Sequence, residues 1–192
     1  MQMTRNILKV YRAATDAQHT SGLNWYGEAH DIALEIGNGD EWRGAGLLAV
    51  YSPLTPWWRN VELAVSSART GIARTDTLGN SARLAQRILD GEFALDVING
   101  IKTRTFCENI ALNGISNNVT VDVHAYSIAI AKATPSSQIK MGVRLYREIE
   151  IAYQNAAKRE NVMETQMQAI SWVVWRDQHP KRAARKGEAM VA

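Results

Sequence analysis

The sequence has little cysteine and little histidine. Its 192 residues include one cysteine, Cys107, which excludes a disulfide within the chain, a zinc site of four cysteines and an iron–sulfur cluster held by cysteines alone. The four histidines lie too far apart in the chain to form a local metal-binding motif: His19, His30, His124 and His179. We therefore expect neither a metal nor any other cofactor.

Long apolar runs are also lacking. The longest, over 44–51 and 169–175, are far shorter than the roughly 20 residues that a membrane-spanning helix needs. The amino-terminal segment mixes charged with apolar side chains and lacks the apolar stretch and small-residue cleavage site of a secretory signal. These absences predict a cytoplasmic protein that makes no contact with a membrane.

What is present is a pattern of apolar residues at helical spacing. The chain is 46% apolar and 21% charged, an ordinary globular balance, and no run of β-branched residues is long enough to predict a strand. The sequence therefore predicts an all-α fold in a single domain over 1–178. The expected helices cover 4–18, 22–37, 40–51, 56–71, 80–90, 101–113, 121–133, 136–159 and 163–178, with a short turn of helix around 92–98.

Positive charge gathers at the carboxyl end. The formal net charge is only +3, but five basic residues crowd the last segment: Arg176, Lys181, Arg182, Arg185 and Lys186. We interpret 179–192 as a basic, flexible tail. It either contacts a polyanion or is a solvated segment that keeps the protein soluble.

Several segments follow one another in an order that is typical of one family. The sequence resembles the helix-hairpin-helix DNA glycosylase superfamily, which has the endonuclease-III-like fold, and above all its small bacteriophage-encoded branch. The resemblance implies two helical lobes with a cleft between them, with both termini in one lobe and a central region over about 40–133. The matching segments are NWYGEAH at 24–30, LLAVYSPLTPWWRNVELA at 47–64, VTVDVHA at 119–125, VDVHAYSIA at 121–129 and QAISW at 168–172.

The resemblance also implies a catalytic role for Asp122. The family carries its catalytic aspartate at the start of a helix, and an ionised carboxylate there stabilises the oxocarbenium-like sugar as the base departs. The residues alone leave another interpretation open, in which Asp122 only caps the helix. Lys102 lies close to the position where bifunctional members carry the lysine that forms a Schiff base with the sugar. Its alternatives are a phosphate contact and a solvated surface lysine.

The segment INGIKTRTF at 98–106 is the candidate DNA-anchoring hairpin, but it has one glycine, Gly100, where the family carries two. We expect Gly100 and Arg104 to contact DNA phosphates, together with Arg59. Leu54 stands at the position of the polar residue that fills the gap left by a flipped base, and it either wedges between bases or packs internally.

Aromatic and polar residues near two helix starts are candidates for the base pocket. Trp25, Tyr26 and Trp57 are suited to stack on an extruded base, although tryptophan more often packs in a core. Glu28 is placed to face the cleft. His124 is assigned to the same pocket, or to a role in orienting a phosphate or Asp122.

Three functions follow from these observations, and the expected partner is double-stranded DNA, with or without modified bases. The first is an enzyme that flips out a modified pyrimidine and processes it with Asp122. The second is amino-group transfer onto a pyrophosphorylated hydroxymethyl pyrimidine in phage DNA, the thymine-hypermodification chemistry of a related branch. The third is a non-catalytic protein of the same fold that binds DNA or another protein. A phage-encoded protein would act in the cytoplasm of the bacterial host.

Overall fold

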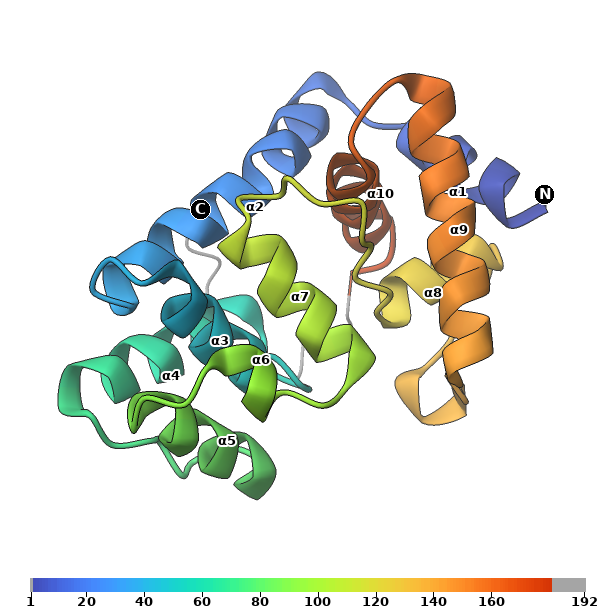
Figure 1. Ribbon diagram of the computed structural model, residues 1–192. Helices are drawn as coiled ribbons and strands as arrows, with labels where there is room; N and C mark the ends of the chain where they lie inside the picture. Colours follow the sequence, from blue (N-terminus) through green and yellow to red (C-terminus); the bar gives the residue numbers. More distant parts are fainter. Residues whose placement is uncertain (1, 181–192) are drawn as a thin grey trace.

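The protein is described by a computed structural model over residues 2–180, a range that contains helices and no strand (Figure 1). This confirms the all-α fold class. The elements are α1 (Gln2–Tyr11), α2 (Asp16–Ile36), α3 (Glu41–Tyr51), α4 (Trp57–Thr70), α5 (Gly79–Leu89), α6 (Ala94–Val97), α7 (Ile101–Ala111), α8 (Val123–Ala129), the 3-10 helix η1 (Ser136–Gln138), α9 (Val143–Glu160) and α10 (Glu164–Gln178). The predicted basic tail lies outside the described residues from 181 onward.

The first two helices break at a different place from the one predicted. The sequence predicts helices over 4–18 and 22–37, whereas α1 ends at Tyr11 and α2 begins at Asp16. The cause is a capping box, in which the Thr15 hydroxyl oxygen accepts from the Gln18 amide at 3.3 Å and Gln18 Oε1 accepts from the Thr15 amide at 3.0 Å. Two free amides are thereby satisfied at the start of α2.

Other helix starts also depart from the prediction. The helix predicted over 136–159 is a single 3-10 turn followed by extended chain, and α9 begins only after Gly142, which is extended with ψ 163°. Thr55 does not cap α4, because its hydroxyl donates to the Pro53 carbonyl, and Pro56 precedes α4 without a side-chain cap. Asp40 caps α3, because its carboxylate accepts from the Arg43 amide at 3.0 Å.

The core consists of two clusters of buried apolar side chains. The central cluster draws on α2 to α7, with α3 in the middle of the group, and we call this part the central lobe. The terminal cluster draws on α1, α8, α9 and α10, and we call this part the terminal lobe. Figure 1 shows the two groups on either side of α10. Helix α8 lies in the 40–133 range that the sequence assigned to the central region, yet it packs with the terminal helices.

Helix α10 joins the two lobes. It contributes Ala169 to the central cluster and Met167 and Ile170 to the terminal cluster, and it packs extensively on α2. The approach of α2 to α10 is so close that a Cβ atom at Gly22 would lie 2.5 Å from the Cα atom of Ile170. Glycine at position 22 therefore fixes the distance between the two helices that face each other across the lobe junction.

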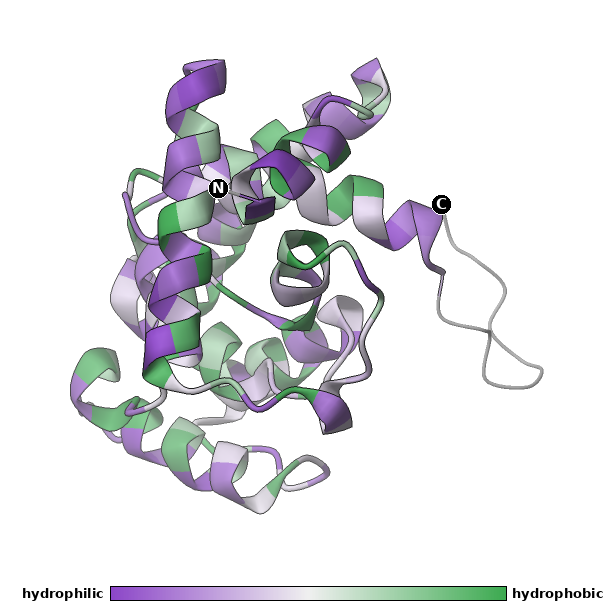
Figure 2. Ribbon diagram, turned by 90° about the vertical axis from the view of Figure 1, so that its right-hand side faces the viewer, coloured by the Kyte–Doolittle hydropathy of each residue, from purple (hydrophilic) through white to green (hydrophobic). Residues whose placement is uncertain are grey.

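Hydrophilic and hydrophobic residues alternate along the helix ribbons rather than forming long uniform segments (Figure 2). This is the pattern of helices that bury one face and expose the other. Among residues 2–180, no helix has the length and apolar character that a membrane span requires.

Candidate functional site

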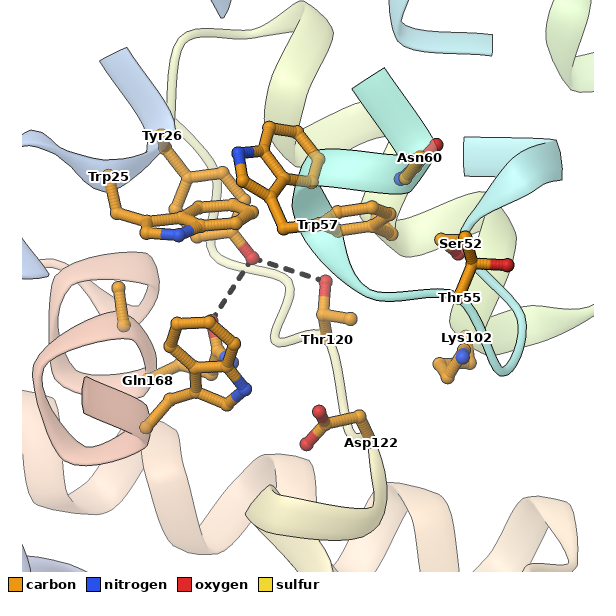
Figure 3. A pocket seen from close by; sticks show the side chains of 13 residues that line it. Trp25, Tyr26, Ser52, Thr55, Trp57, Asn60, Lys102, Thr120, Asp122 and Gln168 are labelled. Atoms are coloured by element: carbon orange, nitrogen blue, oxygen red, sulfur yellow. Dashed lines mark hydrogen bonds between the residues drawn. The ribbon is translucent and has the colours of Figure 1, made fainter. Parts of the chain in front are cut away.

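A cavity of about 150 Å³ opens where the two lobes meet, and we call it the interlobe cleft. Its lining comes from α2, the turn before α4, α4 itself, α7, the extended segment before α8, and α10 (Figure 3). The residues that line it are Trp25, Tyr26, Ser52, Thr55, Trp57, Asn60, Lys102, Phe106, Thr120, Asp122, Gln168, Ala169 and Trp172.

Aromatic rings form one wall of the interlobe cleft. Trp25 lies at the centre of this wall, with its ring centroid 5.2 Å from that of Trp57, 5.8 Å from that of Trp172 and 5.9 Å from that of Phe106. These separations are typical of favourable aromatic contacts. The wall therefore presents a broad π surface that combines rings of both lobes.

The opposite wall includes the extended segment at 119–122, whose side chains alternate. Val119 and Val121 are buried in the terminal cluster, whereas Thr120 and Asp122 line the interlobe cleft. Successive side chains of an extended chain point to opposite sides, so burial of the two valines turns the two polar residues toward the cleft.

Three polar side chains of α9 hold this extended segment in place. The Tyr146 hydroxyl accepts from the Val121 amide at 3.2 Å and donates to the Val119 carbonyl at 2.9 Å. Glu150 accepts from the Val119 amide, and Gln154 donates to the carbonyl of residue 117. Because residues four apart share one helix face, α9 satisfies the backbone of 117–121 as a neighbouring strand would.

Asp122 is the residue immediately before α8, and its Oδ1 accepts from the Ala125 amide at 2.8 Å. This capping bond fixes the carboxylate, while Oδ2 receives no hydrogen bond within residues 2–180. The capping interpretation and the functional interpretation of Asp122 are therefore compatible, since one oxygen caps and the other is available. Lys102, in the first turn of α7, faces the same cleft and is half-buried (Figure 3).

A buried hydrogen-bond network connects the two lobes below the aromatic wall. The hydroxyl hydrogen of Tyr26 is shared between Thr120 Oγ1 at 3.3 Å and Gln168 Oε1 at 3.1 Å, and Asn109 Nδ2 donates to Thr120 at 3.2 Å. Burial raises the pKa of Tyr26 to about 12, so its hydroxyl stays protonated at neutral pH. Tyr26 therefore acts as a permanent donor toward Gln168.

The structure brings together five of the predicted site residues in the interlobe cleft: Trp25, Tyr26, Trp57, Lys102 and Asp122. It places two others elsewhere. Glu28 lies in a separate cavity of about 400 Å³ between α2 and the start of α10. His124 stands behind the cleft wall, with its ring in edge contact with Trp172 at 6.3 Å between centroids.

None of the four predicted DNA-binding residues lines the cleft. Leu54 lies in the turn that supplies Ser52 and Thr55 to the lining, is 84% exposed and has a left-handed φ of 58°. Gly100 precedes α7 with φ −76°, an angle that any residue adopts. Arg59 pairs with Glu62 and Asp76, and Arg104 pairs with Glu108 and donates to the Leu95 carbonyl.

Sequence reasoning missed most of the polar lining. Gln168 and Trp172 lie four residues apart on α10, so they share a face, and QAISW was recognised only as a family segment. Asn60, in the first turns of α4, was not singled out. The signal that was available is an amide side chain within an otherwise apolar helix face.

Cys107 is fully buried, and burial raises the pKa of its thiol to about 12. It packs as a small apolar core residue. Among residues 2–180, no three His, Cys, Asp or Glu side chains are grouped so that they could hold a metal ion.

Comparisons with known proteins identify a family without assigning an activity. No curated protein and no solved structure matches the chain. Residues 1–179 match the family of unknown function DUF7178, and the chain belongs to that family.

Proposed function

We propose that the protein is a DNA-acting enzyme of the helix-hairpin-helix glycosylase type, which accepts a flipped pyrimidine in the interlobe cleft and breaks its bond to the sugar. The observation that carries the proposal is the position of Asp122, a fixed carboxylate with one available oxygen that faces an aromatic cavity. A carboxylate beside apolar walls exerts a stronger field than one in open water.

The dimensions of the cleft suit one flat ring. A cavity of about 150 Å³ in a protein core holds a benzene ring, and the interlobe cleft has that volume. The rings of Trp25, Trp57 and Trp172 offer π surfaces on which a base can stack, while Thr120 and Gln168 supply polar groups. An aromatic wall with a few polar groups is the usual composition of a nucleobase pocket.

The proposed reaction is hydrolysis of the N-glycosidic bond. The bond between C1′ and the base nitrogen breaks, and its electron pair leaves with the base, which takes up one proton. Asp122 stabilises the positive charge that develops on the sugar. A water molecule then adds to C1′ and loses one proton to solvent, which balances the proton taken up by the base, so the products are a free base and an abasic sugar.

Residues around the cleft fit contacts to the DNA backbone and to the gap in the duplex. Lys102 has no ion-pair partner within residues 2–180 and is placed to neutralise a phosphate beside the flipped nucleotide. Leu54 projects an apolar side chain from the turn next to the cleft, where it can occupy the space vacated by the base. The proposal assigns the phosphate grip to Lys102 rather than to the single-glycine hairpin.

Amino-group transfer onto a pyrophosphorylated pyrimidine is less well supported. That reaction needs several cations near the leaving pyrophosphate, but Arg59 and Arg104 are paired with carboxylates and do not line the cleft. A non-catalytic protein that binds DNA or another protein is also less well supported, since binding alone does not require a cavity lined by a carboxylate and buried amides.

The test is release of a free base from duplex DNA, measured by chromatography with uracil, 5-hydroxymethyluracil and thymine substrates. Asp122→Asn keeps the helix cap, because asparagine caps as well as aspartate, and we expect it to abolish release without loss of stability. Asp40→Asn is the matched control, since Asp40 caps α3 outside the cleft in the same way. Full activity of Asp122→Asn, or no release from any of these substrates by the unmodified protein, contradicts the proposal.

A further inference from the structure

Two buried carboxamides face the interlobe cleft from different lobes. Asn60 on α4 is 1% exposed and Gln168 on α10 is 7% exposed, and both line the cavity. Figure 3 shows them on opposite sides of it. Any ring that enters the cleft must therefore satisfy both amide groups or leave them without hydrogen bonds.

The orientation of Gln168 is fixed by its neighbour. Tyr26 donates to Gln168 Oε1, so the carbonyl end of the amide is turned into the protein. The NH₂ group is left for the cleft, and within residues 2–180 it makes no hydrogen bond. Gln168 therefore presents donors, and no acceptor, to a bound ring.

Asn60 has the same polarity. Its Oδ1 is fully buried and has no hydrogen-bond partner among residues 2–180, and Figure 3 draws its nitrogen on the side of Trp57. A buried carbonyl without a partner destabilises the folded state, and the amide gains no internal hydrogen bond in compensation within the described chain. A leucine of similar size would be more stable there, so the NH₂ group of Asn60 is best explained by a ligand.

Two hydroxyl groups in the lining, those of Ser52 and Thr55, have the opposite polarity, whereas Thr120, whose Oγ1 accepts from Tyr26 and Asn109, keeps its hydroxyl hydrogen to donate. Ser52 donates its hydrogen to the Ala49 carbonyl at 2.9 Å, and Thr55 donates to the Pro53 carbonyl at 3.1 Å. Both hydroxyls therefore offer only lone pairs to the cleft. The cavity combines two NH₂ donors with acceptors from hydroxyl and carboxylate groups.

From this polarity we infer that the interlobe cleft selects a pyrimidine with two ring carbonyls and an N–H between them, the uracil and thymine class, and that Gln168 and Asn60 read the two carbonyls. Cytosine is rejected because its exocyclic amine replaces one carbonyl, which sets a donor against an amide donor. The inference rests on the proposed function in one respect, namely that the bound ring is a nucleobase.

The experiment uses free uracil and free cytosine as probes, with binding to the whole protein followed by ligand-observed NMR. We expect uracil to bind at least about tenfold more tightly than cytosine, since an unsatisfied buried donor has about that effect on a binding constant. Gln168→Glu replaces the NH₂ donor by an acceptor and should abolish or invert the preference. Gln166→Glu, on the same helix but outside the interlobe cleft, should leave it unchanged.

A second variant covers the case in which Gln168→Glu does not fold. Tyr26→Phe removes the donor that orients Gln168, so the preference for uracil should shrink, while Tyr126→Phe, outside the cleft, should have no effect. Equal binding of the two bases, a preference for cytosine, or no binding of either base overturns the inference. Binding of free bases does not require the Asp122 reaction, so these outcomes differ from a failure of base release.

Discussion

Glu150 Oε1 accepts a hydrogen bond from the backbone amide of Val119 at 3.2 Å, although the Glu150 side chain is only 4% exposed. The other oxygen of Glu150 pairs with Arg147. This buried carboxylate, hydrogen-bonded to Val119 and paired with Arg147, links α9 to the segment that carries Asp122. The position of the proposed catalytic group thus depends on a residue that does not line the cleft.

This linkage predicts different effects for two substitutions of Glu150. Glu150→Ala leaves the Val119 amide without its partner and should lower the free energy of unfolding by about 1–3 kcal/mol, measured by urea denaturation. Glu150→Gln keeps an acceptor and should cost less. Base release should fall more in Glu150→Ala than in Glu148→Ala, an exposed control two residues away on the same helix. Equal stability of Glu150→Ala, Glu150→Gln and Glu148→Ala would show that the hydrogen bond between Glu150 and the Val119 amide does not stabilise the fold.

The second prediction concerns the contact between α2 and α10. Gly22→Ala places a methyl group 2.5 Å from the backbone of Ile170, so the helices must separate. We expect a loss of about 1–3 kcal/mol in the free energy of unfolding, and weaker ring binding, because Trp25 and Trp172 move apart. Gly79→Ala is the control, since no atom lies within 4 Å of a Cβ at that position. An unchanged melting temperature in Gly22→Ala would contradict the close approach.

The third prediction concerns the phosphate contact proposed for Lys102. If its ammonium group neutralises one phosphate, Lys102→Gln should weaken DNA binding and reduce the slope of log affinity against log salt by about one. Fluorescence anisotropy with a duplex at several salt concentrations measures this slope. Lys158→Gln, at the exposed end of α9, should leave the slope unchanged. The same slope for both variants would assign Lys102 another role.

The sequence predicted the helices better than their ends. The helix predicted over 40–51 matches α3 closely, because the Asp40 side chain caps the helix through a contact with a residue three positions away. Thr15 and Gln18 form the capping box, which involves only residues three apart and therefore indicates in the sequence that α2 begins at Asp16. The start of α9 could not be predicted from neighbouring residues. Both Ser136 and Gly142 can precede a helix, and the path of the preceding loop decides which of them does.

The candidate site was predictable in part for a different reason. Asp122 and Lys102 belong to short motifs that resemble those of the glycosylase superfamily, so the sequence alone indicated both as site residues. Glu28 was expected to face the cleft, but it lines the separate cavity between α2 and the start of α10, which Tyr26 also lines. The amides of Gln168 and Asn60 within apolar helix faces were a signal, but their role depends on which face of a helix meets the opposite lobe, and the sequence does not show that.

The fourth prediction is a loss of stability at alkaline pH. Burial raises the pKa of Tyr26 from 10.0 to about 12 and that of Cys107 from 9.0 to about 12 in the folded protein. Between these values the unfolded chain releases both protons while the folded protein keeps them, so the unfolded state binds fewer protons and stability falls as pH rises. The full contribution is present below about pH 9 and is lost progressively up to about pH 12. Tyr26 can account for up to roughly 3 kcal/mol and Cys107 for up to roughly 4 kcal/mol.

Urea denaturation at pH 8, 9, 10 and 11 measures this decline. The midpoint should fall above pH 9, and Tyr26→Phe and Cys107→Ala should each flatten the decline, because each removes one group that ionises only on unfolding. Tyr126→Phe is the matched control for the tyrosine, since Tyr126 lies outside the interlobe cleft and its hydroxyl makes no hydrogen bond within residues 2–180. The thiol gives an independent check. As the one cysteine of the chain, Cys107 should react with a thiol reagent only as fast as the protein opens, and rapid labelling of the folded protein would show that the α7 face against α3 is not closed.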